Sequence, residues 1–143
     1  MKVCFDTSTL VAALLQQHPH HAVAFPRLQA VKAGSVQGHL TTHCLAELFA
    51  TLTALPLKPR LLPADVDRII RHSILASFTL ISLSADHYRD AMELTVKLNL
   101  ASGAIYDALH LIGARSAGCL TLYTLNLRHF RCLAPGDSII ASP

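Results

Sequence analysis

The fold is decided by the stretch Lys2-Val3-Cys4-Phe5-Asp6-Thr7-Ser8-Thr9-Leu10, residues 2–10. Residues 2–5 form a short, largely apolar run with a β-branched and an aromatic residue, which predicts a β-strand. Asp6 ends this run, and the three hydroxyl side chains that follow are of the kind that cap the first turn of a helix. We therefore expect a strand over residues 2–5 and a helix over residues 10–17.

The same alternation of strand and helix continues to the end of the chain. Short β-rich runs predict further strands at residues 36–41, 78–83, 120–124 and 138–141. Apolar residues at helical spacing predict helices at residues 19–33, 42–55, 63–74, 85–98 and 104–117. This alternation is typical of an α/β fold with a mostly parallel central sheet. We expect a single domain, residues 1–143, with four or five strands flanked by about six or seven helices.

The composition indicates a folded protein of ordinary domain size. The chain has 143 residues, of which 52% are hydrophobic and 15% are charged, so it is too apolar for a disordered segment. The net charge of +3 is compatible with a polyanionic ligand, but many proteins share such a charge. The four cysteines are scattered and form no Cys-x-x-Cys pair, which indicates reduced and mostly buried thiols.

Neither a membrane span nor a signal peptide is expected. The longest apolar stretch, residues 44–57, contains Glu47 and Pro56 and is too short to cross a bilayer. Near the N-terminus, Asp6 and the hydroxyl residues after it stand where a signal peptide needs an apolar segment. A cytoplasmic location is therefore the expectation.

Polar side chains follow two of the predicted strands. Asp6 ends the first strand, and Thr124 and Asn126 end the fourth. Because ligands of open parallel sheets bind beyond the carboxyl ends of the strands, these side chains are candidates for a shared site. An alternative remains open, since an aspartate between a strand and a helix commonly does no more than cap the helix.

Glu47 and Asp107 are each the only charged residue on an apolar helix. Glu47 faces away from the leucine stripe of residues 42–55, and Asp107 is the sole charge between residues 104 and 114. A carboxylate among apolar neighbours needs a compensating partner, and a divalent cation keeps several carboxylates ionised at close range. Oxygen ligands favour a hard ion such as Mg²⁺ or Mn²⁺. The alternative is that each is a lone exposed acid on a plain helix face.

Four segments of the chain resemble a PIN-domain nuclease, and in particular the VapC-type toxins of bacterial toxin–antitoxin modules. The matching segments, in chain order, are Phe-Asp-Thr-Ser-Thr-Leu-Val-Ala-Ala-Leu (5–14), Thr-His-Cys-Leu-Ala-Glu-Leu (42–48), Gly-Ala-Ile-Tyr-Asp-Ala-Leu-His (103–110) and Leu-Tyr-Thr-Leu-Asn-Leu-Arg-His-Phe (122–130). Each motif is loose, but their order and spacing fit the family over nearly the whole chain. The fold that the resemblance implies is a single PIN-like domain.

The resemblance assigns roles to the residues already singled out. It implies that Asp6, Glu47 and Asp107 are the catalytic, metal-binding acids, with supporting hydroxyls near the metal or the scissile phosphate at Ser8 and Thr124. Asn126 stands at the fourth acidic position of the family, and the lost negative charge should weaken a second metal site. Asn126 is therefore expected only as a weaker or water-mediated ligand, and one-metal and two-metal chemistry both stay open.

The function implied by the resemblance is hydrolysis of RNA phosphodiester bonds by a Mg²⁺- or Mn²⁺-dependent endoribonuclease. The implied biological role is that of the toxin in a bacterial toxin–antitoxin pair, with RNA as substrate, a small antitoxin as protein partner and a homodimer as the assembly. The alternative is a catalytically weak or inactive PIN-like module that binds RNA or protein. Only Asn126 favours that alternative.

Nine histidines raise the question of zinc. Two groups contain neighbouring candidates: His18, His20 and His21, and then His39, His43 and Cys44. Neither group has the spacing of an established structural zinc site. His110 lies one helical turn after Asp107, where it can approach the acids, but a packed or hydrogen-bonded core histidine is the expected role.

Overall fold

A computed structural model describes all 143 residues and contains one five-stranded sheet. The strands are β1 (Lys2–Phe5), β2 (Gln37–Thr41), β3 (Phe78–Ile81), β4 (Thr121–Tyr123) and β5 (Ile140–Ala141). Their order across the sheet is β3-β2-β1-β4-β5, and every neighbouring pair is parallel. The predicted α/β fold with a parallel sheet is therefore confirmed.

Seven α-helices surround the sheet. They are α1 (Thr7–Leu14), α2 (His21–Lys32), α3 (Thr42–Ala54), α4 (Pro63–Ile70), α5 (Ala85–Lys97), α6 (Ala104–Ser116) and α7 (Leu127–Leu133). A π-helical segment, η1 (Arg71–Leu75), continues α4 without a break. No helix combines the length and the hydrophobicity that a membrane crossing requires.

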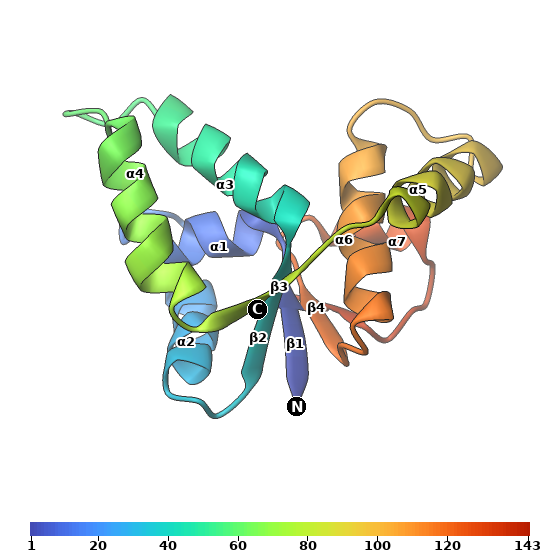
Figure 1. Cartoon of the computed structure of the whole chain (residues 1–143), viewed down its shortest axis with the longest axis horizontal. Helices are drawn as coiled ribbons and strands as arrows, with labels where there is room; N and C mark the ends of the chain where they lie inside the picture. The colour runs from blue at the N-terminus through green and yellow to red at the C-terminus, as the bar shows by residue number, and fades with distance from the viewer.

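The helices form two groups on opposite sides of the sheet, α1 to α4 on one side and α5 to α7 on the other (Figure 1). Each side has its own core, because neighbouring residues of a strand point to opposite faces. Val3 and Phe5 of β1 lie in the core with α1 to α4, whereas Cys4 lies in the core with α5 to α7. All three side chains are fully buried, so β1 is the centre of the molecule.

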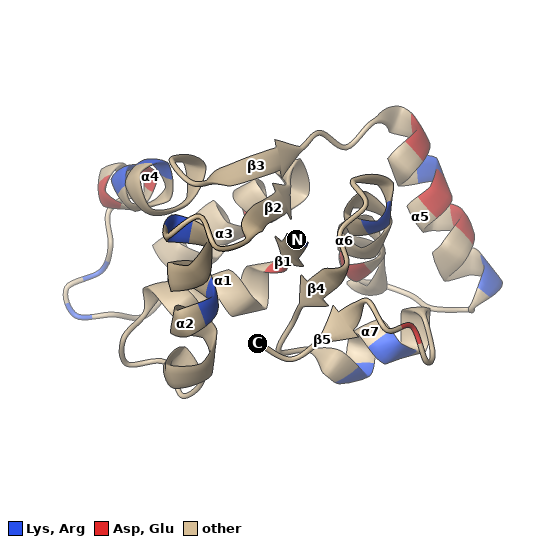
Figure 2. Ribbon diagram, turned by 90° about the horizontal axis from the view of Figure 1, so that it is seen from below, with Lys and Arg blue, Asp and Glu red and all other residues tan.

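The parallel sheet brings the carboxyl ends of its strands to one edge. The strand order reverses at β1, which pairs with β2 on one side and with β4 on the other. Sites in such folds form beyond the strands at this reversal, and Asp6 is the residue that follows β1. Three of the nine acidic residues, Asp86, Asp90 and Glu93, are exposed on α5, along which Figure 2 shows several acidic positions.

The bounds of two predicted elements differ from the structure for identifiable reasons. The first helix begins at Thr7 and not at residue 10, because Asp6 itself is the cap. Strand β3 ends at Ile81 and not at residue 83, because the backbone N–H of Leu83 donates to the Thr42 side chain on α3 and not to a strand. Helix α7 was not predicted, since its seven residues are too few to show a helical period.

Gly38 on β2 provides a test of the packing between the sheet and α2. A Cβ atom at this position would lie 2.5 Å from Val31 Cγ1 and 2.8 Å from Phe78 Cε1. We predict that Gly38→Ala lowers the free energy of unfolding by about 1–3 kcal/mol, the usual cost of overpacking a core. Gly103→Ala is the matched control, because a Cβ atom there would have no neighbouring atom within 4 Å. Urea unfolding measures both, and equal stability of the two variants would contradict the close packing.

Candidate active site

Asp6 is buried, with 2% of its surface exposed, and its carboxylate is held by neighbouring donors. Oδ1 accepts the Thr9 backbone N–H at 2.9 Å and so caps α1. The Ser8 hydroxyl lies 2.8 Å from Oδ1 and 2.9 Å from Oδ2, and the Thr124 hydroxyl donates to Oδ2 at 2.6 Å. The helix-cap role left open by the sequence is therefore real, but it accounts for only one of these hydrogen bonds.

Ser8 and Thr124 each connect Asp6 to the segment after β4. The Ser8 hydroxyl oxygen accepts the Leu125 backbone N–H at 3.0 Å, and the Thr124 hydroxyl oxygen accepts that of Asn126 at 2.9 Å. Because their oxygens accept hydrogen bonds from these amides, both hydroxyl groups are oriented to donate hydrogen bonds to Asp6. All donors to Asp6 are neutral, so its negative charge is stabilised by dipoles and is not neutralised.

Glu47 projects from α3 with 30% of its side chain exposed. Oε1 lies 3.2 Å from His110 Nε2 and 2.8 Å from His43 Nε2, while Oε2 accepts the Thr7 hydroxyl at 3.1 Å. Burial raises the pKa of Glu47, but the hydrogen bond with His110, the electrostatic influence of the two imidazole rings and the Thr7 hydroxyl outweigh it. The pKa of Glu47 therefore falls below its ordinary value.

His43 approaches Glu47 without forming a directed hydrogen bond. Its Nε2 atom is buried and has no hydrogen-bond partner, although Glu47 Oε1 is 2.8 Å away. We regard this contact as a short electrostatic approach, because the distance is favourable while the bond direction is not. The His43 ring stacks on Tyr106, with centroids 4.9 Å apart and an interplanar angle of 15°.

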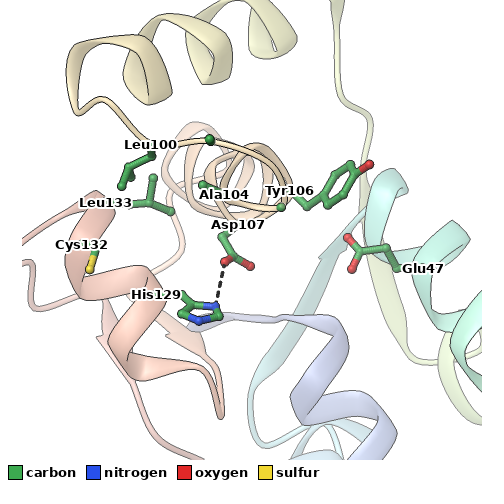
Figure 3. A pocket seen from close by; sticks show the side chains of 10 residues that line it. Glu47, Leu100, Ala104, Tyr106, Asp107, His129, Cys132 and Leu133 are labelled. Carbon is green, nitrogen blue, oxygen red and sulfur yellow. Dashed lines mark ion pairs between the residues drawn. The ribbon is translucent and has the colours of Figure 1, made fainter.

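Asp107 projects from α6 toward His129, whereas Glu47 reaches the same region from α3 (Figure 3). Asp107 Oδ2 lies 3.6 Å from Nδ1 of His129, whose ring is exposed. Burial raises the pKa of Asp107 to about 6; His110 and His129 oppose this rise, and the charges of Asp6 and Glu47 add to it. Asp6 and Glu47 therefore lie close enough to Asp107 for their charges to act on it.

Two cavities meet at Glu47. One, of about 450 Å³, is lined by Glu47, Asp107, His129 and a mainly apolar wall from α6 and α7. The other, of about 470 Å³, contains Ser8, Glu47 and Asn126 among its lining residues. Asn126 is exposed and its side chain forms no hydrogen bond. It lines only the second cavity, whereas Asp107 lines only the first.

The acids are not preassembled around a common point. No group of three or more His, Cys, Asp or Glu side chains in this structure is arranged to hold a metal ion. The donor chemistry nevertheless fits a hard cation, because Asp6, Glu47 and Asp107 offer oxygen atoms and none of them pairs with Lys or Arg. The three ion pairs that do contain arginine involve other acids. The metal-binding role of the three acids stays a prediction.

Sequence reasoning underrated the polar residues around Glu47. The sequence predicts Thr7 only as a helix-capping residue and His110 chiefly as a core histidine, yet both contact Glu47. A signal for His43 was available, because it precedes Glu47 by one helical turn. The role of His110 needed the tertiary structure, since it reaches Glu47 from a different helix.

The other histidines considered for zinc have different partners. His21 Nδ1 lies 2.9 Å from the backbone oxygen of Ala12, and His39 Nδ1 lies 3.0 Å from that of Gln37. His18 Nδ1 accepts the backbone N–H of His20 at 3.1 Å. These rings interact with backbone groups and not with one another's ring nitrogens.

Two solved structures with the same fold extend over nearly the whole chain. VapC20 from Mycobacterium tuberculosis, described as a toxin that cleaves the sarcin–ricin loop, matches with a TM-score of 0.72 and 22% identity over 99% of each chain. VapBC2 from Rickettsia felis, solved with a DNA fragment from its promoter, gives a TM-score of 0.68 and 21% identity over 99% of this chain and 98% of that chain. At these identities the likeness concerns the fold alone.

Similarity in sequence identifies the family of the chain. The family model of the PIN domain matches residues 2–128. Ribonuclease VapC40 of Mycobacterium tuberculosis is 34% identical over 126 residues, which cover 86% of this chain and 85% of the relative. Ribonuclease VapC27 of the same species is 30% identical over 109 residues, or 76% and 74% of the two chains. The chain therefore belongs to the PIN-domain family and, within it, to the VapC group.

Proposed function

We propose that this protein is a ribonuclease toxin of a toxin–antitoxin pair, and that it hydrolyses RNA phosphodiester bonds with Mg²⁺ or Mn²⁺. The relatives in the VapC group are ribonucleases by name, which supports the reaction class. The site that we assign to it consists of Asp6, Glu47 and Asp107, at the carboxyl edge of the sheet and on the two adjoining helices.

One observation carries the proposal: none of the three acids pairs with an arginine or a lysine. Burial raises the pKa of Asp107 to about 6, and the charges of the nearby Asp6 and Glu47 add to this rise. Such an arrangement is unfavourable in the isolated chain, and a divalent cation removes the conflict. When bound, Mg²⁺ or Mn²⁺ would supply charge neutralisation at the phosphate and a more acidic water.

The chain's own residues divide the remaining tasks. Ser8 and Thr124 fix the orientation of the Asp6 carboxylate by donating hydrogen bonds from their hydroxyl groups. Thr7 holds Oε2 of Glu47, and the cavity beside Glu47 and Asp107 is large enough to admit part of an RNA strand. Asn126 offers an amide oxygen in the neighbouring cavity and is the proposed weaker or water-mediated ligand.

The proposal includes partners. Two of the structural neighbours are VapBC2 from Rickettsia felis and FitAB, both solved on DNA, and this supports a small antitoxin as the protein partner of our chain. We further propose a homodimer in the cytoplasm, where its RNA substrate is present. Light scattering on the purified chain measures the homodimer. The same measurement on the chain co-expressed with an upstream small reading frame measures the complex with the antitoxin.

A PIN-like module that binds RNA or protein without cleaving it is the second candidate. Two observations favour it: an asparagine occupies the fourth acidic position, and the acids are not preassembled. Cleavage by the purified chain separates the two candidates, because only the nuclease releases RNA fragments in a manner that EDTA abolishes.

Replacing Asp107 tests the nuclease directly. We predict that Asp107→Asn lowers cleavage of a structured RNA by about 100-fold or more, since even supporting groups at metal sites are worth 10–100-fold. The matched control is Asp90→Asn, because Asp90 is an exposed aspartate on α5. Gel-based cleavage with Mn²⁺ measures the rate. Cleavage by Asp107→Asn at the wild-type rate would assign the activity to other residues.

The same substitution has a predicted effect on stability in the absence of metal. The folded pKa of Asp107 is about 6 against an ordinary value of 3.8, so its protonated form is favoured in the fold. The free energy of unfolding therefore falls as the pH rises from about 4 to above 6, by at most about 3 kcal/mol. Asp107→Asn should be more stable than wild type in urea with EDTA at pH 8, and the difference should vanish near pH 4. A destabilised variant at pH 8 contradicts the assignment.

Cation binding should depend on pH through the same group. Asp107 must be ionised to bind a cation, and its pKa of about 6 means that protons compete with the cation below that pH. We predict that Mn²⁺ affinity, measured by calorimetry, is nearly constant between pH 7 and 8 and falls about fivefold between pH 6 and 5. An affinity that does not change down to pH 5 excludes Asp107 as a ligand.

A further inference from the structure

Thr41 occupies the junction between β2 and α3 and is fully buried. It is the N-cap of α3: its hydroxyl oxygen accepts the Cys44 backbone N–H at 3.1 Å. The same hydroxyl lies 3.0 Å from His110 Nδ1 on α6. No other atom in the structure forms a hydrogen bond with it. The hydroxyl proton therefore has one available acceptor, the Nδ1 atom of His110.

This arrangement determines which nitrogen of His110 carries the proton. If Nδ1 were protonated, it would donate to the Thr41 oxygen, and the buried hydroxyl proton of Thr41 would have no acceptor. An unsatisfied buried donor is costly, and this applies equally to the doubly protonated ring. Nδ1 is therefore the acceptor, and the proton of the neutral ring resides on Nε2.

His110 Nε2 faces Oε1 of Glu47 at 3.2 Å, and the ring is 2% exposed, so water does not compete for this contact. His43 Nε2 crowds the same oxygen at 2.8 Å. The other oxygen, Oε2, accepts only the Thr7 hydroxyl. Each carboxylate oxygen offers two lone-pair sites, so Oε2 keeps one of them free.

We propose that Thr41 and His110 are positioning residues: they fix the Nε2–H tautomer of His110, which holds Oε1 of Glu47 and presents Oε2 as the metal-binding oxygen. The interaction connects the helix cap of α3 to a carboxylate on the same helix through a ring from α6. The assignment of Oε2 rests on the proposed nuclease function, whereas the tautomer does not depend on it.

The tautomer is measured without any activity. Long-range ¹H–¹⁵N spectra of the histidine rings in the metal-free chain distinguish Nδ1–H from Nε2–H, and His110→Gln identifies the His110 signals by their loss. We expect a single Nε2–H form at neutral pH in wild type and in Thr41→Ser, which keeps the hydroxyl. In Thr41→Val, which lacks it, the Nδ1–H form should appear. A dominant Nδ1–H form in wild type overturns the proposal.

Metal affinity tests the consequence for Glu47. His110→Gln retains an amide N–H in place of Nε2–H, whereas His110→Asn is too short to reach Glu47 and His110→Leu has no donor. We expect Mn²⁺ binding by calorimetry to weaken by about tenfold or more in the Asn and Leu variants and to recover in the Gln variant. His39→Gln is the matched control, because His39 is a buried histidine of β2 that contacts backbone and not Glu47.

The pattern across the variants separates a positioning role from a purely structural one. If His110 only fills space, His110→Leu retains affinity best and Gln gives no rescue, which overturns the proposal. Thermal unfolding of each variant identifies any loss that is due to misfolding, and the Gln–Asn comparison is made between variants with equal unfolding temperatures. If wild type neither binds Mn²⁺ nor cleaves RNA, the proposed nuclease and the role of Oε2 fail together, while the spectra still decide the tautomer.

Discussion

The rest of the site depends on a single buried carboxylate, that of Asp6. It follows the central strand, caps α1 and accepts hydrogen bonds from the hydroxyl groups of Ser8 on α1 and Thr124 after β4. Burial of a charged group requires such donors, since an unsolvated carboxylate is strongly unfavourable. The hydrogen bonds between Ser8 and Leu125 and between Thr124 and Asp6 therefore connect the end of β1 and the start of α1 to the segment after β4, at the position where a ligand would bind.

The fold was largely readable from the sequence because strand and helix periods alternate clearly. Residues 2–5 were predicted as a strand with the bounds that β1 has, and the predicted start of α5 at residue 85 was also correct. Two features were not readable. Helix α7 is shorter than two helical turns, and the start of α1 depended on whether Asp6 or a later hydroxyl residue was the cap. Both kinds of side chain can cap a helix, and only the backbone geometry shows that Asp6 is the cap.

The sequence predicts the three acids of the candidate site, whose metal-binding role stays a prediction, but it does not predict the residues around them. Isolated charges on apolar helices mark Glu47 and Asp107, because that pattern is visible along a single helix. The partners of Glu47 come from α1 and α6, and no periodicity connects Thr7 or His110 with a residue on α3. Sequence also could not show that the acids are turned toward protein donors and not toward one point.

The choice of neutral donors around the acids has a physical consequence. Arginine or lysine would neutralise the carboxylates permanently, and a divalent cation would then have to displace a fixed positive charge. Hydroxyl and imidazole N–H groups orient the oxygens of Asp6 and Glu47 while leaving their charge available. The resulting electrostatic repulsion acts on Asp107: burial and the neighbouring acids raise its pKa to about 6. The electrostatic cost to the fold and the capacity to attract a cation thus have the same origin.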